Sequence, residues 1–234
     1  MPLSEHLLCF RNISKSYYGN SVLSNISFEV NRGEVHALIG ENGAGKSTLM
    51  NILFGMPVIH STGGFEGRVI IDGNTCDIRS PHEAMQAGIG MVHQEFMLIP
   101  QYTVAENIKL NREITTPNIF SRIFGKRLET LDFAKMDADA RKALDKLDMD
   151  IEAYTVVAGL PVGHMEFIEI AREIDKTGIK ILVFDEPTAV LTESEAQNLL
   201  AAIKRLAAMG IGIIFISHRL DEIIDVADRV TILR

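Results

Sequence analysis

Gly40-Glu41-Asn42-Gly43-Ala44-Gly45-Lys46-Ser47-Thr48 is the stretch that decides the fold of this 234-residue chain. It fits the pattern G-x-x-x-x-G-K-[ST], a loop that wraps the phosphates of a nucleotide. The apolar run 35–39 before it suits a buried strand, and residues 46–53 after it have a helical pattern. Glycines let successive backbone N–H groups point at the phosphates, and the helix N-terminus adds a partial positive charge. We therefore expect Lys46 to reach the β- and γ-phosphates and the Ser47 hydroxyl to ligate Mg²⁺.

The amino-acid composition argues against a nucleic-acid-binding, a zinc-binding and a membrane-spanning protein. Hydrophobic residues make up 47% of the chain, enough for one large domain or two small ones. The net charge of −8 and the pI near 5.4 argue against a nucleic-acid-binding surface. Cys9 and Cys76 have no CxxC partner, which predicts reduced thiols and no zinc site. No apolar run approaches the roughly 18 residues of a membrane helix, so a partner is expected to span any membrane involved.

Strand and helix patterns alternate over most of the chain. The first thirty residues have strand patterns at 7–13 and 22–30, with a turn near Gly19-Asn20. Further strands are predicted at 68–71, 89–92, 180–184, 211–216 and 229–233. Helices are predicted from Ser80-Pro81, where Ser caps the helix, and at 164–175, 193–207 and 219–226. Such alternation implies an α/β fold with a parallel sheet covered on both faces.

The segment from Gln94 to Val162 has a different character. Thr103 and Glu106 form a capping-box pattern, and Met136, Ala140, Ala143, Leu144 and Leu147 keep helical spacing. No stretch of this segment has the pattern of a buried strand, so we interpret it as a helical insertion into the α/β core. The sequence stops at Leu233-Arg234, in or just after a strand, and we expect a truncated chain or the first half of a longer polypeptide.

Two further motifs follow predicted strands. The apolar run 180–184 ends in Asp185 and Glu186. Asp185 is placed to hold Mg²⁺, directly or through water, opposite Ser47, and Glu186 to orient and polarise an attacking water. His218 follows the next strand, so it too is expected at the carboxyl edge of the sheet, where α/β folds bind ligands. A γ-phosphate contact is its predicted role.

Together these residues resemble the ATP-binding subunit of an ABC transporter, and the resemblance runs through the whole chain. In that family's order, Tyr17 matches the aromatic residue that stacks on adenine, with Tyr18 as the alternative. Gln94 matches the Q-loop glutamine, which contacts Mg²⁺ and water and couples to the membrane subunit. A kinase or a GTPase would share the phosphate loop but not this ordered set, and no NKxD guanine motif is present.

The resemblance assigns roles to the remaining residues. It implies catalytic roles for Lys46, Gln94, Glu186, the family's catalytic glutamate, and His218, its switch histidine. Metal contacts are implied for Ser47, Gln94 and Asp185. The expected nucleotide contacts are Tyr17, Gly40, Asn42, Gly43, Ala44, Gly45, Lys46, Ser47, Thr48 and Gly163.

The resemblance also implies an architecture. We expect a P-loop NTPase of α/β class, with a mostly parallel sheet covered by helices, an N-terminal antiparallel β subdomain and an α-helical insertion. One ABC-type ATP-binding domain would then fill 1–234. Residues 1–93 and 163–234 would form its core, and 94–162 its helical subdomain.

Within the family, the chain looks most like the ATPases of bacterial simple-sugar importers for ribose, xylose or galactose. The stretches that carry this likeness are 13–17, 167–172 and 186–192, and nucleoside importers remain an alternative. The implied function is ATP hydrolysis that drives import, with Mg²⁺ as cofactor. The implied partners are integral-membrane permease subunits, a second ATP-binding domain and, indirectly, an extracytoplasmic receptor, but no nucleic acid. The implied location is the cytoplasmic face of the membrane.

One motif departs from the family. The signature Leu-Ser-Gly-Gly-Gln is Leu160-Pro161-Val162-Gly163-His164 in this chain. Proline lacks the hydroxyl that contacts the γ-phosphate of the other domain, and it lacks a backbone N–H. One interpretation is that Pro161 merely starts the helix and that the site works with weaker phosphate contacts. The other is that the site built on the partner's phosphate loop is impaired, while the site built on Lys46 is intact. A soluble non-transport ABC-type ATPase and a non-hydrolysing regulatory module are the alternative functions.

Overall fold

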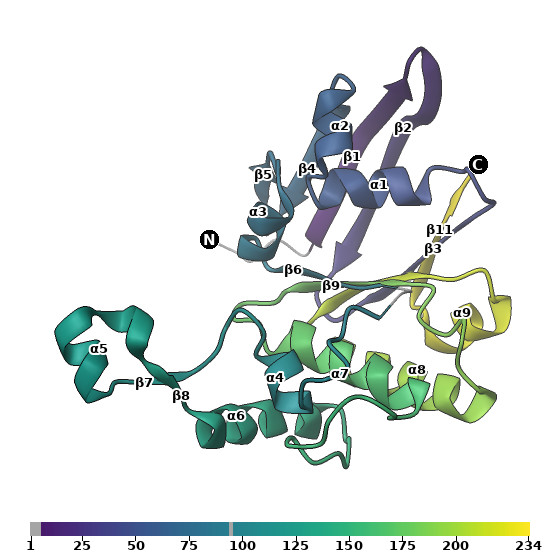
Figure 1. Ribbon diagram of the computed structural model, residues 1–234. Coiled ribbons are helices and arrows are strands. Elements are labelled where there is room, and N and C mark those ends of the chain that lie inside the picture. Colours follow the sequence, from purple (N-terminus) through teal and green to yellow (C-terminus); the bar gives the residue numbers. More distant parts are fainter. Residues whose placement is uncertain (1–5, 94–95) are drawn as a thin grey trace. The chain divides into compact units, whose positions relative to one another are not determined.

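The computed structural model describes residues 6–93 and 96–234, which divide into two compact units (Figure 1). The first unit comprises residues up to 94 together with 177–234, and the second comprises 95–176. The second unit thus extends beyond the expected boundary at 162. It does so because α7 (Val162–Ile174) packs against α4 (Val104–Ile108) and α6 (Phe133–Lys146). That 1–93 and 163–234 act as one core stays a proposal.

A five-stranded parallel sheet forms the centre of the first unit. Its strands lie in the order β11-β3-β10-β9-β6, and every neighbouring pair is parallel. They are β3 (Val35–Gly40), β6 (Ile89–Val92), β9 (Ile181–Asp185), β10 (Gly212–Ile216) and β11 (Arg229–Leu233). The central strands β9 and β10 are apolar at almost every position and buried on both faces, as parallel strands between helical layers are.

A second, antiparallel sheet shares the same unit. Its strands, in the order β2-β1-β4-β5, are β1 (His6–Tyr17), β2 (Asn20–Asn31), β4 (Glu66–Ile71) and β5 (Asn74–Cys76). Leu8, Phe10 and Ile13 of β1 join one apolar core with α1 (Lys46–Leu53) and with Val183 and Ile214 of the parallel sheet. The antiparallel N-terminal β subdomain and the parallel sheet both agree with the predicted fold class.

The described helices of the first unit are α1 (Lys46–Leu53), α2 (Pro57–Ser61), α3 (Pro81–Gln86), α8 (Glu193–Ala208) and α9 (Leu220–Val226). Three of them, α1, α3 and α8, begin where the sequence predicts, and α9 begins one residue later. Ser80 caps α3 by accepting a hydrogen bond from the Glu83 N–H, and Thr192 forms a capping box with Glu195 at the start of α8. In Figure 1, α1 and α8 lie on opposite faces of the parallel sheet. Short α2 and β5 were not predicted.

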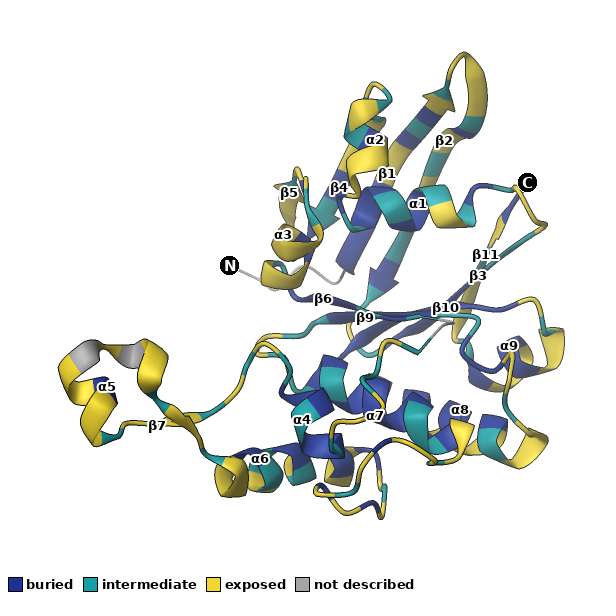
Figure 2. Ribbon diagram, viewed as in Figure 1, coloured by how far each residue is buried: buried dark blue, intermediate teal, exposed yellow. Residues whose placement is uncertain are grey.

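The second unit is mainly helical, as expected for the insertion. Besides α4, α6 and α7 it contains β7 (Thr115–Thr116), α5 (Ile119–Phe124), the 3₁₀ turn η1 (Lys126–Leu128) and β8 (Thr130–Leu131). The apolar stripe predicted between Met136 and Leu147 is buried (Figure 2). The helix predicted at 164–175 begins earlier, at Val162, because Pro161 takes an extended conformation and serves as its N-cap.

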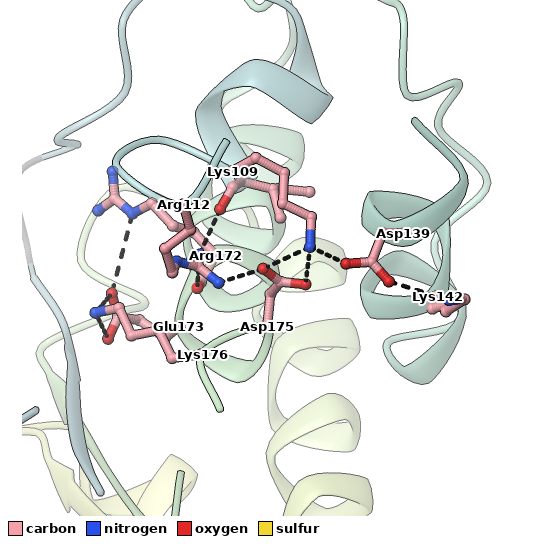
Figure 3. A network of polar contacts seen from close by, with 9 residues as sticks. Lys109, Arg112, Asp139, Lys142, Arg172, Glu173, Asp175 and Lys176 are labelled. Carbon is pink, nitrogen blue, oxygen red and sulfur yellow. Dashed lines mark hydrogen bonds and ion pairs between the residues drawn. The ribbon is translucent and has the colours of Figure 1, made fainter. Parts of the chain in front are cut away.

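Ion pairs hold the helices of the second unit together (Figure 3). The Lys109 ammonium, which is buried, contacts Asp139 of α6 and donates to both oxygens of Asp175, at 2.7 and 3.0 Å. Asp175 also pairs with Arg112, whose guanidinium donates to the Arg172 carbonyl at 3.1 Å. Buried charges are tolerated when they are paired and hydrogen-bonded, so this network fixes α4, α6 and the end of α7 to one another.

Candidate functional site

The register of the parallel sheet brings three segments to one edge. Ile216, the last residue of β10, pairs with Leu38 of β3 on one side and with Asp185 of β9 on the other. The chain that follows each of these strands therefore starts at the same carboxyl edge. These three segments begin at Glu41, Glu186 and Ser217, so the phosphate loop and both later motifs lie at the edge where α/β folds bind ligands.

The phosphate loop owes its shape to two glycines. Gly43 and Gly45 have φ angles of 89° and 96°, a region that strongly favours glycine. A Cβ on Gly45 would also lie 2.5 Å from Leu23 Cδ2 of β2. Glu41 accepts a hydrogen bond from the Ala44 N–H at 3.1 Å, which closes the turn, while Asn42 at its tip is exposed.

The loop leads directly into α1, whose first turn carries the side chains that the sequence predicts to contact phosphate. Gly45 is the N-cap and has no side chain to cap the helix. The helix N-terminus, with Lys46, Ser47 and Thr48 in its first turn, therefore presents backbone donors and a partial positive charge. The Lys46 ammonium donates to the carbonyls of Gly40 at 2.6 Å and Glu41 at 3.2 Å, which keeps it over the loop.

Asp185 faces the same loop from the end of β9. Burial is the largest influence on its pKa and raises it, as does the neighbouring Glu186 charge. His93 and Lys46 lower this pKa, so both side chains lie close enough to act on Asp185. The structure thus brings Lys46 and Asp185 together, as the sequence predicts. It adds His93, which follows β6 and which the sequence analysis did not single out, although its position after a parallel strand is the signal that could have found it.

Glu186 and His218 form the second half of the site. The Glu186 Oε1 lies 3.3 Å from His218 Nδ1, and the Glu186 N–H donates to the Ile216 carbonyl at 2.9 Å. Glu186 has a φ of 50°, unusual for a residue with a side chain. Non-glycine residues in this conformation concentrate at functional sites, where surrounding contacts stabilise the strain.

A buried hydrogen-bond network supports the His218 segment. The buried Glu222 carboxylate accepts hydrogen bonds from the hydroxyls of Thr188 at 2.7 Å and Ser217 at 3.2 Å, and its other oxygen lies 2.6 Å from Arg219 Nη1. Thr188 follows Glu186, and Ser217 precedes His218. The network therefore links the two segments that carry the catalytic candidates. Sequence reasoning missed it because Glu222 looks like an ordinary charged residue near a helix start.

Tyr17 and Tyr18 differ sharply in environment. Tyr17, at the end of β1, packs against the apolar core, and the Lys15 ammonium lies 4.7 Å from the centre of its ring. Lys15 itself is buried and donates to the carbonyls of Ile59, Thr62 and Gly64. Tyr18 is exposed, with a φ of 49°. Stacking of either ring on adenine stays a prediction.

Two predicted residues lie outside the described part of the first unit, which forms this edge. Gln94 lies outside the described residues. Gly163 belongs to the second unit, where it is buried in the first turn of α7 after Pro161. Pro161 caps α7 without a side-chain hydrogen bond, and the N–H groups of His164 and Met165 lie 3.0 and 3.2 Å from its carbonyl oxygen.

Neither a metal cluster nor a membrane helix is found in the described part of the chain. Among residues 6–93 and 96–234, no three His, Cys, Asp or Glu side chains are grouped to hold a metal. Cys9 and Cys76 are free thiols. Over the same residues, no helix has both the length and the apolar character to cross a bilayer. A divalent ion here would need Ser47, Asp185 and oxygens of a bound ligand.

Comparison with known proteins gives consistent matches. Residues 23–189 match the family model described as ABC transporter. The chain is 40% identical to the xylose import ATP-binding protein of Thermoanaerobacter pseudethanolicus, over 99% of this chain and 43% of that protein. It is 43% identical to the ribose import ATP-binding protein of Hahella chejuensis, over 97% of this chain and 42% of that protein. The chain thus spans less than half the length of these relatives.

Solved structures agree on the fold. A nucleotide-free ATP-binding cassette from an ABC transporter superposes with a TM-score of 0.78 at 27% identity. The match covers 97% of this chain and 87% of that one.

Proposed function

Because this chain belongs to the ABC transporter family, we propose that it is an ATP-binding and ATP-hydrolysing domain that powers import of a simple sugar. The observation that carries this proposal is the meeting of Lys46, Asp185 and the Glu186–His218 pair at one sheet edge. Relatives named for xylose and ribose import support the sugar class, and a nucleoside is the alternative cargo.

The phosphate loop would bind and orient the triphosphate. Backbone N–H groups of Gly43, Gly45 and α1 would surround the phosphates, and Lys46 would exchange its two carbonyl contacts for the β- and γ-phosphates. Because this ammonium is already held over the loop, little reorganisation is needed at the moment of reaction. Its charge would stabilise the negative charge that develops on the transferred phosphoryl group.

Glu186 would act on the attacking water. Its carboxylate would orient the water and polarise it, and the strained backbone and the hydrogen bond to the Ile216 carbonyl fix its direction. His218, 3.3 Å from this carboxylate, would contact the γ-phosphate and hold Glu186 in place. Gln94 would complete the site and couple it to the membrane subunit.

The residues present fit a magnesium ion. Mg²⁺ prefers hard oxygen ligands and binds through one or two protein groups plus phosphate oxygens. The Ser47 hydroxyl and the Asp185 carboxylate offer this donor set, with Gln94 as a further ligand. Bound Mg²⁺ would neutralise charge on the β- and γ-phosphates. Burial raises the Asp185 pKa overall, and His93 and Lys46 act against that rise, toward the ionised carboxylate that this role requires.

The family organisation implies two partners. A second ATP-binding domain would supply the signature that faces Lys46, and this chain's Gly163 and α7 would face the partner's phosphate loop. Permease subunits would carry the cargo across the membrane, which places this chain at the cytoplasmic face. An extracytoplasmic receptor would deliver the sugar.

ATP binding and steady-state hydrolysis by the chain, beside Glu186→Gln, test the proposal. We expect turnover that rises faster than linearly with protein concentration, because two domains must meet. Turnover should be lost in Glu186→Gln while ATP binding is kept. A non-hydrolysing regulatory module would bind ATP, and its function would be unchanged in Glu186→Gln. Turnover that is equal with and without added permease subunits would instead favour a soluble, non-transport ATPase.

A further inference from the structure

The second unit has a group of apolar side chains that are exposed and do not pack into its core. Ile119, Phe120 and Ile123 of α5 are 74%, 67% and 69% exposed. Leu128 and Leu131, which follow in η1 and β8, are exposed as well. We call residues 115–131 the tip hairpin. Figure 1 shows α5 at the far end of β7 and β8 from α6, and Figure 2 shows it largely exposed. Monomeric proteins seldom gather bulky apolar side chains on an exposed surface unless it binds something.

Polar contacts hold the tip hairpin in shape. Asn118 and Ser121 form a capping box at the start of α5, and the Asn118 amide donates to the Leu128 carbonyl at 2.6 Å. At the base, the Thr116 hydroxyl donates to Asp132 at 2.8 Å. A six-residue helix is marginal in water without such support. These hydrogen bonds hold the backbone of the hairpin in one shape, so its exposed apolar side chains form a preformed surface.

The charge of the tip hairpin opposes that of the chain. No Asp or Glu occurs between Ile114 and Leu128, whereas Arg122, Lys126 and Arg127 do. Arg122 and Arg127 are exposed beside the apolar residues. The chain as a whole carries a net charge of −8, so a negatively charged partner would be repelled by the chain in general and attracted at this hairpin.

We propose that the tip hairpin binds the surface of an anionic lipid bilayer. Short segments that combine bulky apolar side chains with an excess of Lys and Arg over acidic residues insert into the headgroup region and attract anionic lipids. In residues 115–131, Arg122, Lys126 and Arg127 outnumber the one acidic residue, Glu129. A permease loop fits less well, because cytoplasmic loops of membrane proteins carry an excess of Lys and Arg and would repel the hairpin. A second copy of this hairpin would be repelled for the same reason.

Sedimentation of the chain with lipid vesicles tests this. The vesicles contain equal parts of phosphatidylglycerol and phosphatidylcholine, or phosphatidylcholine alone. We expect binding to the anionic vesicles that weakens with added salt and is weak on neutral ones. Arg122→Gln/Arg127→Gln should weaken it on the order of tenfold. Ile119→Ser/Phe120→Ser/Ile123→Ser should weaken it at least as much.

Matched controls place the changes elsewhere on the surface. Leu220→Ser/Ile224→Ser alters two exposed apolar residues of α9, and Arg68→Gln/Lys204→Gln removes the same charge from exposed positions. Both should bind vesicles as the parent does. Circular dichroism and ATP binding should be unchanged in every variant, because all altered residues are exposed and none belongs to the nucleotide site.

Several outcomes would overturn the proposal. Absence of vesicle binding, equal binding to neutral vesicles, or variants that bind as the parent does would each refute it. Self-association lost in the apolar variant would assign the surface to a second copy. Binding that requires permease in the vesicles would assign it to that protein. Vesicle binding is measured without nucleotide, so it succeeds or fails independently of ATP hydrolysis.

Discussion

Asp185 and Glu186 are adjacent residues with opposite environments. Asp185 ends a buried strand, and burial raises its pKa above the ordinary value. Glu186 leaves the sheet in a left-handed backbone conformation and turns toward His218. Two consecutive carboxylates are therefore placed for different roles: Asp185 for contact with a metal ion and Glu186 for contact with an attacking water.

The raised pKa makes Asp185 a source of instability in the free protein. A carboxyl group with a folded-state pKa above its unfolded value stabilises the fold only below the unfolded value, and this contribution is lost as pH rises through the folded value. We therefore expect Asp185→Asn to unfold at a higher temperature than the parent at pH 8. The difference should vanish toward pH 3, where the parent carboxyl is protonated as well.

ATP turnover should fall even though the variant is more stable, because an amide cannot replace the carboxylate that we propose binds the metal. ATP turnover in Asp185→Asn should fall at least on the order of a hundredfold. Thermal unfolding at several pH values and steady-state hydrolysis check the two expectations. Equal melting temperatures at pH 8 would show that the buried charge is already compensated, and unchanged turnover would remove Asp185 from the metal site.

Among single residues, the sequence predicts those whose role is indicated by their immediate neighbours in the chain. Lys46 and Ser47 follow from the glycine loop, and Glu186 from its place after an apolar run. Glu222 could not be predicted in the same way. Its role depends on a hydrogen bond from a distant segment, since the Thr188 hydroxyl is 34 positions away in sequence.

Among the secondary-structure elements, helix starts were the most predictable feature. The capping residues Ser80, Thr103 and Thr192 each accept the hydrogen bond that their sequence patterns indicate. Helix α7 was less predictable, since its N-cap is a proline. It also buries Glu166, whose pKa is raised to about 8 by burial and then by Glu169. Helical periodicity marks such a residue as solvent-facing, and only tertiary packing reveals otherwise.

The junction of α4, α6 and α7 depends on Lys109. We expect Lys109→Met to lower the free energy of unfolding by about 3 kcal/mol, because it leaves buried Asp175 with Arg112 alone and removes one of the two partners of Asp139. Urea unfolding followed by circular dichroism measures this. Lys135→Met, which breaks the exposed pair with Asp132, is the control and should cost less than about 1 kcal/mol. Equal effects of the two variants would contradict a structural role for the buried network.

For the molecule as a whole, alternation of strands and helices predicted a parallel sheet but not its strand order. The order β11-β3-β10-β9-β6 places the C-terminal β11 beside β3, far away in sequence. Nothing in local spacing specifies such a pairing, which follows from which apolar faces fit together. The boundary of the second unit has the same origin, since α7 joins it through packing against α4 and α6.

The proline at position 161 leads us to predict unequal ATP turnover at the two nucleotide sites of an assembled transporter. In this family each nucleotide site combines the phosphate loop of one domain with the signature of the other. Pro161 is the N-cap of α7 and offers neither a hydroxyl nor an N–H to a γ-phosphate. The site on the partner's phosphate loop should therefore be impaired. The site on Lys46 uses the signature of the partner domain, so it should be intact. We expect Glu186→Gln to remove most ATP turnover, and loss of the partner's catalytic glutamate to remove little.

Restoring the hydroxyl should correct the asymmetry. A hydrogen bond to a charged group contributes about 1.5–3 kcal/mol, so Pro161→Ser should speed turnover at the impaired site by on the order of tenfold or more. Pro161→Ala is the matched control, because it restores the backbone N–H without the hydroxyl. Single-turnover hydrolysis in transporters that carry one inactivated site separates the two contributions. Equal turnover at both sites of the parent would show that Gly163 and the N-terminus of α7 suffice, and that Pro161 only starts the helix.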